Sequence, residues 1–273
     1  MSAAPDRYAL FGHPVAHSVS PQIHAAFAQQ AGQNLRYEKR EIPLDGFAAA
    51  VADFFAGGGK GVNATLPFKG EAFACAGRIT PRAEAASAVN TLWPADDGTL
   101  VGDNTDGVGF VRDLTINKGI AVTGKTVLLM GAGGAARGVL RPLLELAPAR
   151  LHIANRTAAR ATELAEDPNV TGGGFDDWPD LRFDLIINAT AAGHGGSAIA
   201  PPPTLLAPGC ACYDLSYGDA AVPFLEWARR QGVARTLDGW GMLVEQAAES
   251  FFLWRGVKPD TGAVIAAGPA SLR

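Results

Sequence analysis

A lysine and an aspartate in the first 106 residues have the chemistry of a proton-transfer pair. Lys69 follows a short expected strand that ends at Asn63 and Thr65. In the first turn of a helix a lysine opposes the helix dipole, which indicates a chemical role, with a solvated surface lysine as the alternative. Asp106 could simply cap the helix that follows it. On neighbouring strand ends, Lys69 and Asp106 would make a proton-transfer pair.

Two serines and an asparagine extend this polar set. Ser18 and Ser20 precede Pro21, so Ser20 is predicted to be a helix N-cap with proline at the first helical position. The hydroxyls and N–H groups of such a helix start could equally receive a carboxylate, and the residues alone leave both roles open. Asn90 lies in a third polar cluster, residues 88–91. Because open α/β sheets bind ligands beyond the carboxyl ends of their strands, all these clusters are candidate binding segments.

A glycine-rich turn is the strongest single motif. The apolar run 127–130 leads directly into Gly131-x-Gly133-x-x-Ala136, and a helical pattern follows. Glycines at these positions permit a tight turn and let a helix N-terminus approach a pyrophosphate, as in dinucleotide-binding units. An ordinary strand-to-helix turn is the alternative.

The residues after the next strand indicate which dinucleotide is bound. An NAD-binding unit carries an acidic residue here to hold the ribose hydroxyls. This chain has Asn155, Arg156 and Thr157 instead, with Arg160 one turn further on. Arginine attracts a ribose phosphate, so the segment predicts NADP rather than NAD, although Arg160 could also lie on a solvated helix face.

The elements that must position these residues follow an α/β pattern. Strand-like runs alternate with helical patterns along nearly the whole chain, which predicts mainly parallel sheets covered by helices. At 273 residues the chain should form one large or two modest domains. A Gly/Asp/Asn/Thr cluster at 103–109 is the expected boundary. The chain has 33 glycines, about 12% of its residues, which exceeds the usual ~7%, and they show no collagen-like period.

Composition excludes several classes of protein. The chain has a net charge of −4 and so lacks the excess of basic residues that a nucleic-acid binder carries. It also has no apolar stretch long enough to span a bilayer. The three cysteines lack the spacing of a metal site, so we expect no metal. Without a charged segment followed by a long apolar one at the start, cytoplasmic residence is expected.

Taken together and in order, these segments resemble the family of NADP-dependent shikimate dehydrogenases. The matching segments run from near the beginning to near the end of the chain: HSVSP (17–21), GVNATLPFK (61–69), AVNT (88–91), DNTDG (103–107), GAGGA (131–135), NRT (155–157), NAT (188–190), YDLSY (213–217) and DGWGMLVEQ (238–246). The resemblance implies reversible hydride transfer between NADPH and the keto group of 3-dehydroshikimate.

The resemblance also implies a role for each matching residue. Lys69 would exchange the proton at the substrate oxygen, and Asp106, paired with it, would bind a substrate hydroxyl. The implied substrate-binding residues are Ser18 and Ser20 for the carboxylate with Tyr217 nearby, together with Asn63, Thr65, Lys69, Asn90, Asp106 and Gln246. The implied cofactor residues are Gly131, Ala132, Gly133, Gly134 and Ala135 for the pyrophosphate, Asn155, Arg156, Thr157 and Arg160 for the ribose phosphate, and Thr190, Leu215 and Gly239 for the nicotinamide side.

The family further implies two domains with the active site between them. Residues 1–105 plus 240–273 would form a discontinuous substrate domain, and residues 106–239 a Rossmann-type NADP domain. After Asn188-Ala-Thr190, where the family commonly has serine, this chain has Ala191. A quinate/shikimate dehydrogenase with relaxed substrate or cofactor use is the alternative function, and the protein is expected to be a monomer or homodimer that binds a small molecule.

Overall fold

The structure is a computed structural model that describes residues 4–195 and 199–272. Its contacts divide the chain into a first unit, which comprises residues up to 109 and from 243 onward, and a second unit, Phe110–Met242. These limits differ by a few residues from the expected domain boundaries. Helices α5 (Asp106–Arg112) and α9 (Trp240–Arg255) each run across one limit, and Asp106 falls in the first unit.

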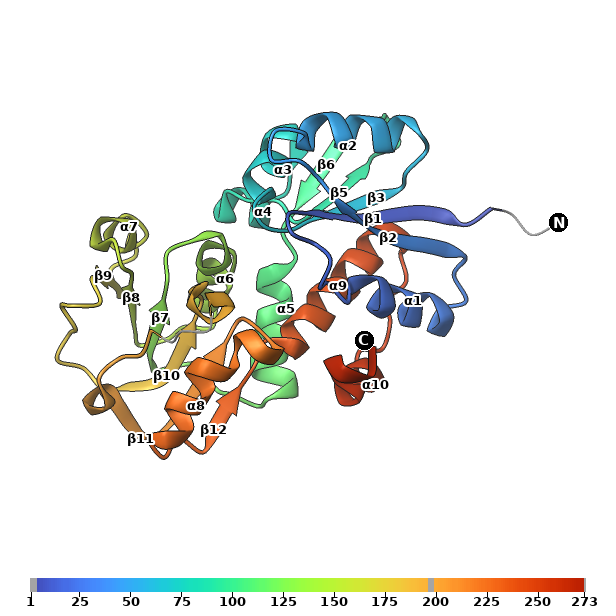
Figure 1. The fold of residues 1–273 in the computed structure, drawn as a ribbon. Helices are drawn as coiled ribbons and strands as arrows, with labels where there is room; N and C mark the ends of the chain where they lie inside the picture. Colours follow the sequence, from blue (N-terminus) through green and yellow to red (C-terminus); the bar gives the residue numbers. More distant parts are fainter. Residues whose placement is uncertain (1–3, 196–198, 273) are drawn as a thin grey trace. The chain divides into compact units, whose positions relative to one another are not determined.

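A six-stranded mixed sheet forms the centre of the first unit (Figure 1). Its strands lie in the order β2-β1-β3-β5-β6-β4. Only β5 is antiparallel, and it is antiparallel to both of its neighbours. The bounds are β1 (Asp6–Gly12), β2 (Leu35–Glu41), β3 (Gly61–Ala64), β4 (Arg78–Ile79), β5 (Thr91–Pro94) and β6 (Leu100–Asp103).

Helices cover this sheet because its strands alternate apolar residues toward both faces. On one face, Phe11 of β1 packs among Phe47, Phe54 and Phe68. On the other face, Tyr8 stacks on Trp254 of α9 with ring centroids 4.8 Å apart. The remaining helices of this unit are α1 (Ser20–Gln30), α2 (Phe47–Ala56), α3 (Lys69–Cys75), α4 (Pro81–Ala86), α10 (Gly262–Ala267) and the 3₁₀ turn Pro269–Leu272.

One histidine of α1 is buried among aromatic rings without a polar partner. His24 is 1% exposed, stacks on Tyr37 at 4.1 Å, and neither ring nitrogen has a hydrogen-bond partner. Burial lowers the pKa of His24 to about 3. Below its ordinary pKa of 6.5 the unfolded chain therefore takes up a proton that the folded chain does not, so the free energy of unfolding falls as the pH drops from 6.5 toward 3.

Replacing His24 by phenylalanine should remove this acid sensitivity. The free energy of unfolding should fall between about pH 8 and about pH 5 in the natural protein. In His24→Phe this fall should be smaller by about 2 kcal/mol, because the apolar ring has no proton to bind. Urea unfolding at a series of pH values measures the effect. An unaltered profile in His24→Phe would contradict the assignment.

The second unit contains a six-stranded parallel sheet in the order β12-β11-β10-β7-β8-β9. Numbered from β7 along the chain, this is the 3-2-1-4-5-6 order of dinucleotide-binding folds, which reverses between β7 and β10. The strands are β7 (Thr126–Met130), β8 (Arg150–Ala154), β9 (Val170–Gly173), β10 (Phe183–Asn188), β11 (Leu206–Asp214) and β12 (Arg235–Leu237). The helical segments are α6 (Gly134–Glu145), α7 (Ala158–Glu163), α8 (Val222–Arg230), the π-helix Asp113–Asn117, and the 3₁₀ turns Ala192–Gly195, Pro203–Leu205 and Gly218–Ala220.

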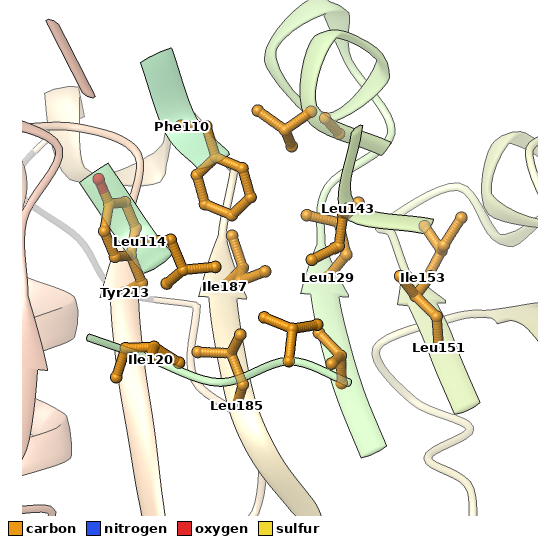
Figure 2. Packing of buried hydrophobic residues seen from close by; sticks show 14 of the residues in the cluster. Phe110, Leu114, Ile120, Leu129, Leu143, Leu151, Ile153, Leu185, Ile187 and Tyr213 are labelled. Carbon is orange, nitrogen blue, oxygen red and sulfur yellow. The ribbon is translucent and has the colours of Figure 1, made fainter. Parts of the chain in front are cut away.

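This sheet is buried on both faces, as parallel sheets require. Figure 2 shows the face on which Leu129 and Ile187 pack with Leu143 of α6 and with Phe110 and Leu114. The neighbouring residues along the same strands point to the other face, against α8. Among the described residues, no helix is long and apolar enough to cross a membrane.

Candidate functional site

The lysine and the aspartate singled out in the sequence form an ion pair. Lys69 is the first residue of α3, as its place in a first helical turn predicts, and Asp106 is the first residue of α5. The Nζ atom of Lys69 donates to Oδ2 of Asp106, and the two side chains are 19% and 9% exposed. The pair is therefore partly buried while the ammonium group stays accessible, and an ammonium has two further N–H donors for another oxygen.

Asn90 holds the aspartate of this pair from a second side. Its Nδ2 donates to Oδ1 of Asp106 at 2.8 Å, and also lies 3.0 Å from the Thr105 hydroxyl and 3.3 Å from Oε1 of Gln246. In return, Oδ1 of Asn90 accepts the backbone N–H of Thr105 at 2.9 Å. Four of the expected substrate residues, Lys69, Asn90, Asp106 and Gln246, are thus brought together. Thr105 belongs to the same group and was not singled out in the sequence, although it lies inside the DNTDG segment.

The turn that carries Asp106 is fixed by a buried charge network. Asp103 is 1% exposed and accepts from Nε and Nη2 of Arg82 at 2.7 and 2.6 Å and from the Thr80 hydroxyl at 2.6 Å. The next residue, Asn104, accepts the backbone N–H of Asp106 at 3.1 Å. Two arginine–carboxylate bonds of this kind set orientation as well as position, so the start of α5 has a defined place.

Asn63 and Thr65 lie at the end of β3 but differ in accessibility. Asn63 is 7% exposed, and its amide is engaged within the protein: Oδ1 accepts from Tyr37 at 2.8 Å, and Nδ2 donates to Thr91 at 3.0 Å. Nδ2 also donates to Ser250 of α9 at 3.1 Å, a residue that stands one turn beyond Gln246. Thr65 is half-buried. Asn63 therefore joins strands and α9, whereas Thr65 remains available to a ligand.

The serine pair differs from the expected helix cap by one residue. The N-cap of α1 is Val19, and Ser20 is the first helical residue with Pro21 second, so the prediction of Ser20 as N-cap is wrong. The N-cap residue Val19 makes no side-chain capping bond. Instead the Ser18 hydroxyl donates to that of Ser20 at 3.0 Å and accepts the Ser20 backbone N–H at 3.2 Å. The two hydroxyls lie side by side at a helix N-terminus, an arrangement that suits an anion.

In the second unit, the glycine turn lies at the point where the strand order reverses. Gly131 has φ +109°, and a Cβ atom there would lie 2.9 Å from the Ala189 carbonyl oxygen, so only glycine lets the turn pass the chain after β10. Gly133 is the N-cap of α6 and Gly134 its first residue, and a Cβ atom on either would meet nothing within 4 Å. Packing within the protein does not require these two glycines, whereas the approach of a pyrophosphate does. The turn therefore fits a dinucleotide.

The expected ribose-phosphate residues form an exposed cationic segment after β8. Asn155 donates from Nδ2 to the Thr157 carbonyl oxygen at 3.0 Å, which shapes the turn. Thr157 is the N-cap of α7, and its side chain makes no capping bond. Arg156 and Arg160 are exposed, and neither forms an ion pair with any residue that the structure describes. Both guanidinium groups are free to bind a phosphate.

The other expected cofactor residues lie in the same unit, within the glycine turn or after the strands β10, β11 and β12. Ala132 is buried and Ala135 half-buried, on either side of the two exposed glycines. Thr190, Leu215 and Gly239 follow β10, β11 and β12, at the carboxyl edge of the sheet. Tyr217 is also in the second unit, half-buried and with its ring centroid 5.8 Å from that of Trp240.

The second unit has a parallel sheet in dinucleotide-binding order with a glycine turn at its reversal point, and the first unit carries a lysine–aspartate pair. Together these features define a dinucleotide-dependent dehydrogenase. Comparisons with known proteins identify which one. Family models match in three parts: the shikimate dehydrogenase substrate binding domain at residues 10–92, shikimate / quinate 5-dehydrogenase at 114–195, and the shikimate 5'-dehydrogenase C-terminal domain at 239–267. The chain belongs to the shikimate dehydrogenase family.

Similar proteins cover the whole length of the chain. Shikimate dehydrogenase (NADP(+)) of Alkalilimnicola ehrlichii is 55% identical over 266 residues, which are 96% of this chain and 98% of that protein. A crystal structure of an Ael1 enzyme from Pseudomonas putida has a TM-score of 0.90 and 45% identity, with 96% of this chain and 97% of that one covered. Shikimate 5-dehydrogenase from Thermus thermophilus, in complex with NADP(H) and shikimate, has a TM-score of 0.84 and 33% identity, with 97% and 99% covered.

Proposed function

We propose that this protein catalyses the reversible NADPH-dependent reduction of 3-dehydroshikimate to shikimate, a step of chorismate and aromatic amino acid biosynthesis. The Lys69–Asp106 ion pair is the observation that carries the proposal, because it supplies a proton-transfer group within the polar cluster that Asn90 and Gln246 complete. The full-length similarity to NADP-dependent shikimate dehydrogenases supports the same substrate and cofactor.

The residues of this chain have separate tasks in the reaction. NADP, when bound, accepts or supplies the hydride. In the direction of reduction the Lys69 ammonium gives a proton to the carbonyl oxygen and becomes a neutral amine, and in the direction of oxidation that neutral amine takes the hydroxyl proton of shikimate. Asp106 keeps the ammonium group oriented and receives a neighbouring substrate hydroxyl. Because the substrate is small, rigid and polar, each contact that fixes its orientation contributes to rate.

The remaining substrate contacts follow from the chemistry of the side chains. Ser18 and Ser20 hold the carboxylate, with Tyr217 as a further contact. Thr65, Asn90 and Gln246 bind ring hydroxyls. Asn63 stabilises this wall from within, since its amide is already engaged with Tyr37, Thr91 and Ser250.

The cofactor contacts, the domains and the setting complete the proposal. The turn Gly131–Ala135 receives the pyrophosphate, the segment Asn155–Arg160 the ribose phosphate, and Thr190, Leu215 and Gly239 the nicotinamide side. Residues 1–105 plus 240–273 are the substrate domain and 106–239 the NADP domain. The enzyme is cytoplasmic and a monomer or homodimer.

A spectrophotometric assay tests the proposal directly. We expect NADPH to form when purified protein is mixed with shikimate and NADP⁺, and to form much more slowly with NAD⁺ or with quinate. The same comparison separates this activity from that of a quinate/shikimate dehydrogenase, which would use quinate, NAD⁺ or both at similar rates. A protein that binds NADP⁺ but forms no NADPH from shikimate would sink the proposal.

A further inference from the structure

A buried asparagine–aspartate pair links the ends of two strands in the second unit. Asn188 and Asp214 are the last residues of β10 and β11 and lie opposite each other in the register of the parallel pair. Nδ2 of Asn188 donates to Oδ2 of Asp214 at 2.7 Å. The two residues are 3% and 1% exposed, so neither side chain can reach a ligand in solvent directly.

The pair is bonded to two of the three segments that carry an expected nicotinamide residue, and it is connected to the third through Ser216. Oδ1 of Asn188 accepts both the backbone N–H and the hydroxyl of Thr190, at 3.1 and 2.8 Å. The Asn188 carbonyl oxygen accepts the N–H of Leu215 at 2.8 Å. Oδ1 of Asp214 accepts the N–H of Ser216 at 2.8 Å, and the Ser216 carbonyl in turn accepts the N–H of Gly239 at 2.8 Å. The two side chains thus bond the segments at Thr190 and Leu215 directly, and the segment at Gly239 is joined to them through the backbone of Ser216.

The carboxylate is expensive to bury, which argues that its position has a use. Burial raises the pKa of Asp214 to about 6, and the nearby Asp238 carboxylate adds to the rise, while the donors Ser216 and Asn188 oppose it. Both carboxylate oxygens of Asp214 face N–H donors, from Asn188 and from Ser216, so the geometry is that of a group that only accepts hydrogen bonds. An uncharged pair would join two strands at a lower desolvation cost.

We propose that Asn188 and Asp214 are positioning residues for NADP, which hold the segments at Thr190, Leu215 and Gly239 in the geometry that receives the nicotinamide half of the cofactor. This inference rests on the proposed function, because it assumes that these three segments receive that half. The two residues act through the segments and touch neither substrate nor cofactor.

The hydrogen-bond pattern allows a sharp test by exchanging the two side chains. In Asp214→Asn both oxygen positions of residue 214 face N–H donors, so the introduced amide group opposes a donor in either orientation. In Asn188→Asp two carboxylates face each other at atoms that are now 2.7 Å apart. The double variant Asn188→Asp/Asp214→Asn restores every bond, because the amide now donates from position 214 while its oxygen accepts from Ser216, and the carboxylate accepts from Thr190.

Isothermal titration with NADP⁺ in the absence of shikimate is the primary measurement. Each single variant should raise the dissociation constant at least about tenfold, and the double variant should return it to within about threefold of the natural protein. Asp184→Asn is the matched control, since Asp184 lies at the opposite end of β10, where it accepts the backbone N–H of Thr126 at 2.9 Å. That control should bind NADP⁺ normally.

Two further measurements separate positioning from general stability. Steady-state kinetics should show KM for NADP⁺ raised in the single variants with KM for shikimate nearly unchanged, and amide hydrogen exchange should show lost protection confined to residues 188–191 and 214–217. Single variants that bind NADP⁺ normally would overturn the proposal, as would a double variant that binds no better than the weaker single variant or does not fold. If the natural protein binds NADP⁺ but does not oxidise shikimate, the proposed function fails, while the titrations still decide the role of the pair.

Discussion

Replacing Lys69 by alanine should lower kcat for shikimate oxidation by roughly a hundred- to ten-thousand-fold, the range of general acid–base catalysis. The variant removes the only lysine that contacts Asp106 among the described residues, and with it the amine group that exchanges a proton with the substrate oxygen. KM for shikimate should change far less, because Ser18, Asn90 and Gln246 keep their places. Initial rates over a range of shikimate concentrations, at saturating NADP⁺, separate the two parameters.

Lys60 provides the control for this variant. It is exposed and lies in the same segment at the other end of β3, so Lys60→Ala changes the charge in the same way without touching the pair. Its kcat should equal that of the natural protein. We expect Lys69→Ala to fold, because Asp106 keeps its hydrogen bond from Asn90. Thermal unfolding of both variants checks that the loss of activity is not a failure to fold. A Lys69→Ala protein with near-normal kcat would show that the proton is handled elsewhere.

Removing both arginines after β8 should abolish most of the preference for NADP over NAD. A hydrogen bond to a charged group contributes about 1.5–3 kcal/mol, or about ten- to a hundredfold in affinity, so Arg156→Ala/Arg160→Ala should reduce the preference by about a hundredfold or more. The effect should appear in kcat/KM for NADP⁺, with the value for NAD⁺ unchanged, because NAD lacks the ribose phosphate.

The matched control for the arginine variant is Arg150, on the strand that precedes the two arginines. Arg150 is exposed and begins β8, at the edge opposite the nucleotide turn. Arg150→Ala removes one positive charge from the second unit, half of what the double variant removes, and should leave the ratio of the two cofactors unaltered. If the double variant and Arg150→Ala behave alike, the preference arises from net charge rather than from contact with the ribose phosphate.

The local pattern of the sequence is sufficient for the fold class and the glycine turn. Apolar runs before Gly131 and Asn155 predict parallel strands, and β7 and β8 are parallel neighbours. The antiparallel β5 is not predictable in this way, because strand direction depends on which partner a strand finds in three dimensions. The predicted N-cap of α1 is wrong by one residue, because a serine before a proline fits two adjacent positions of a helix start equally well.

In the candidate site, too, some residues are predictable from local sequence pattern, whereas contacts between distant segments are not. Lys69 and Asp106 were singled out because their types and helix positions are informative without knowledge of the fold. The contacts of Ser250 with Asn63 and Thr91 join residues more than 150 positions apart. No pattern in either segment indicates such a contact. The one available signal was the spacing of Ser250, which stands four residues after Gln246 and hence on the same face of a helix.

The return of α9 to the first unit has a consequence for the order in which the protein can be completed. Ser250 has no exposed surface and bonds to the Thr91 and Thr105 side chains at 2.8 and 3.2 Å, beside the residues that hold Asp106. During synthesis, the ribosome makes residues 110–239 before it makes α9. Most of the nucleotide unit can thus be folded while the surroundings of Lys69 and Asp106 still lack Ser250, and the first unit acquires this contact only after α9 has been made.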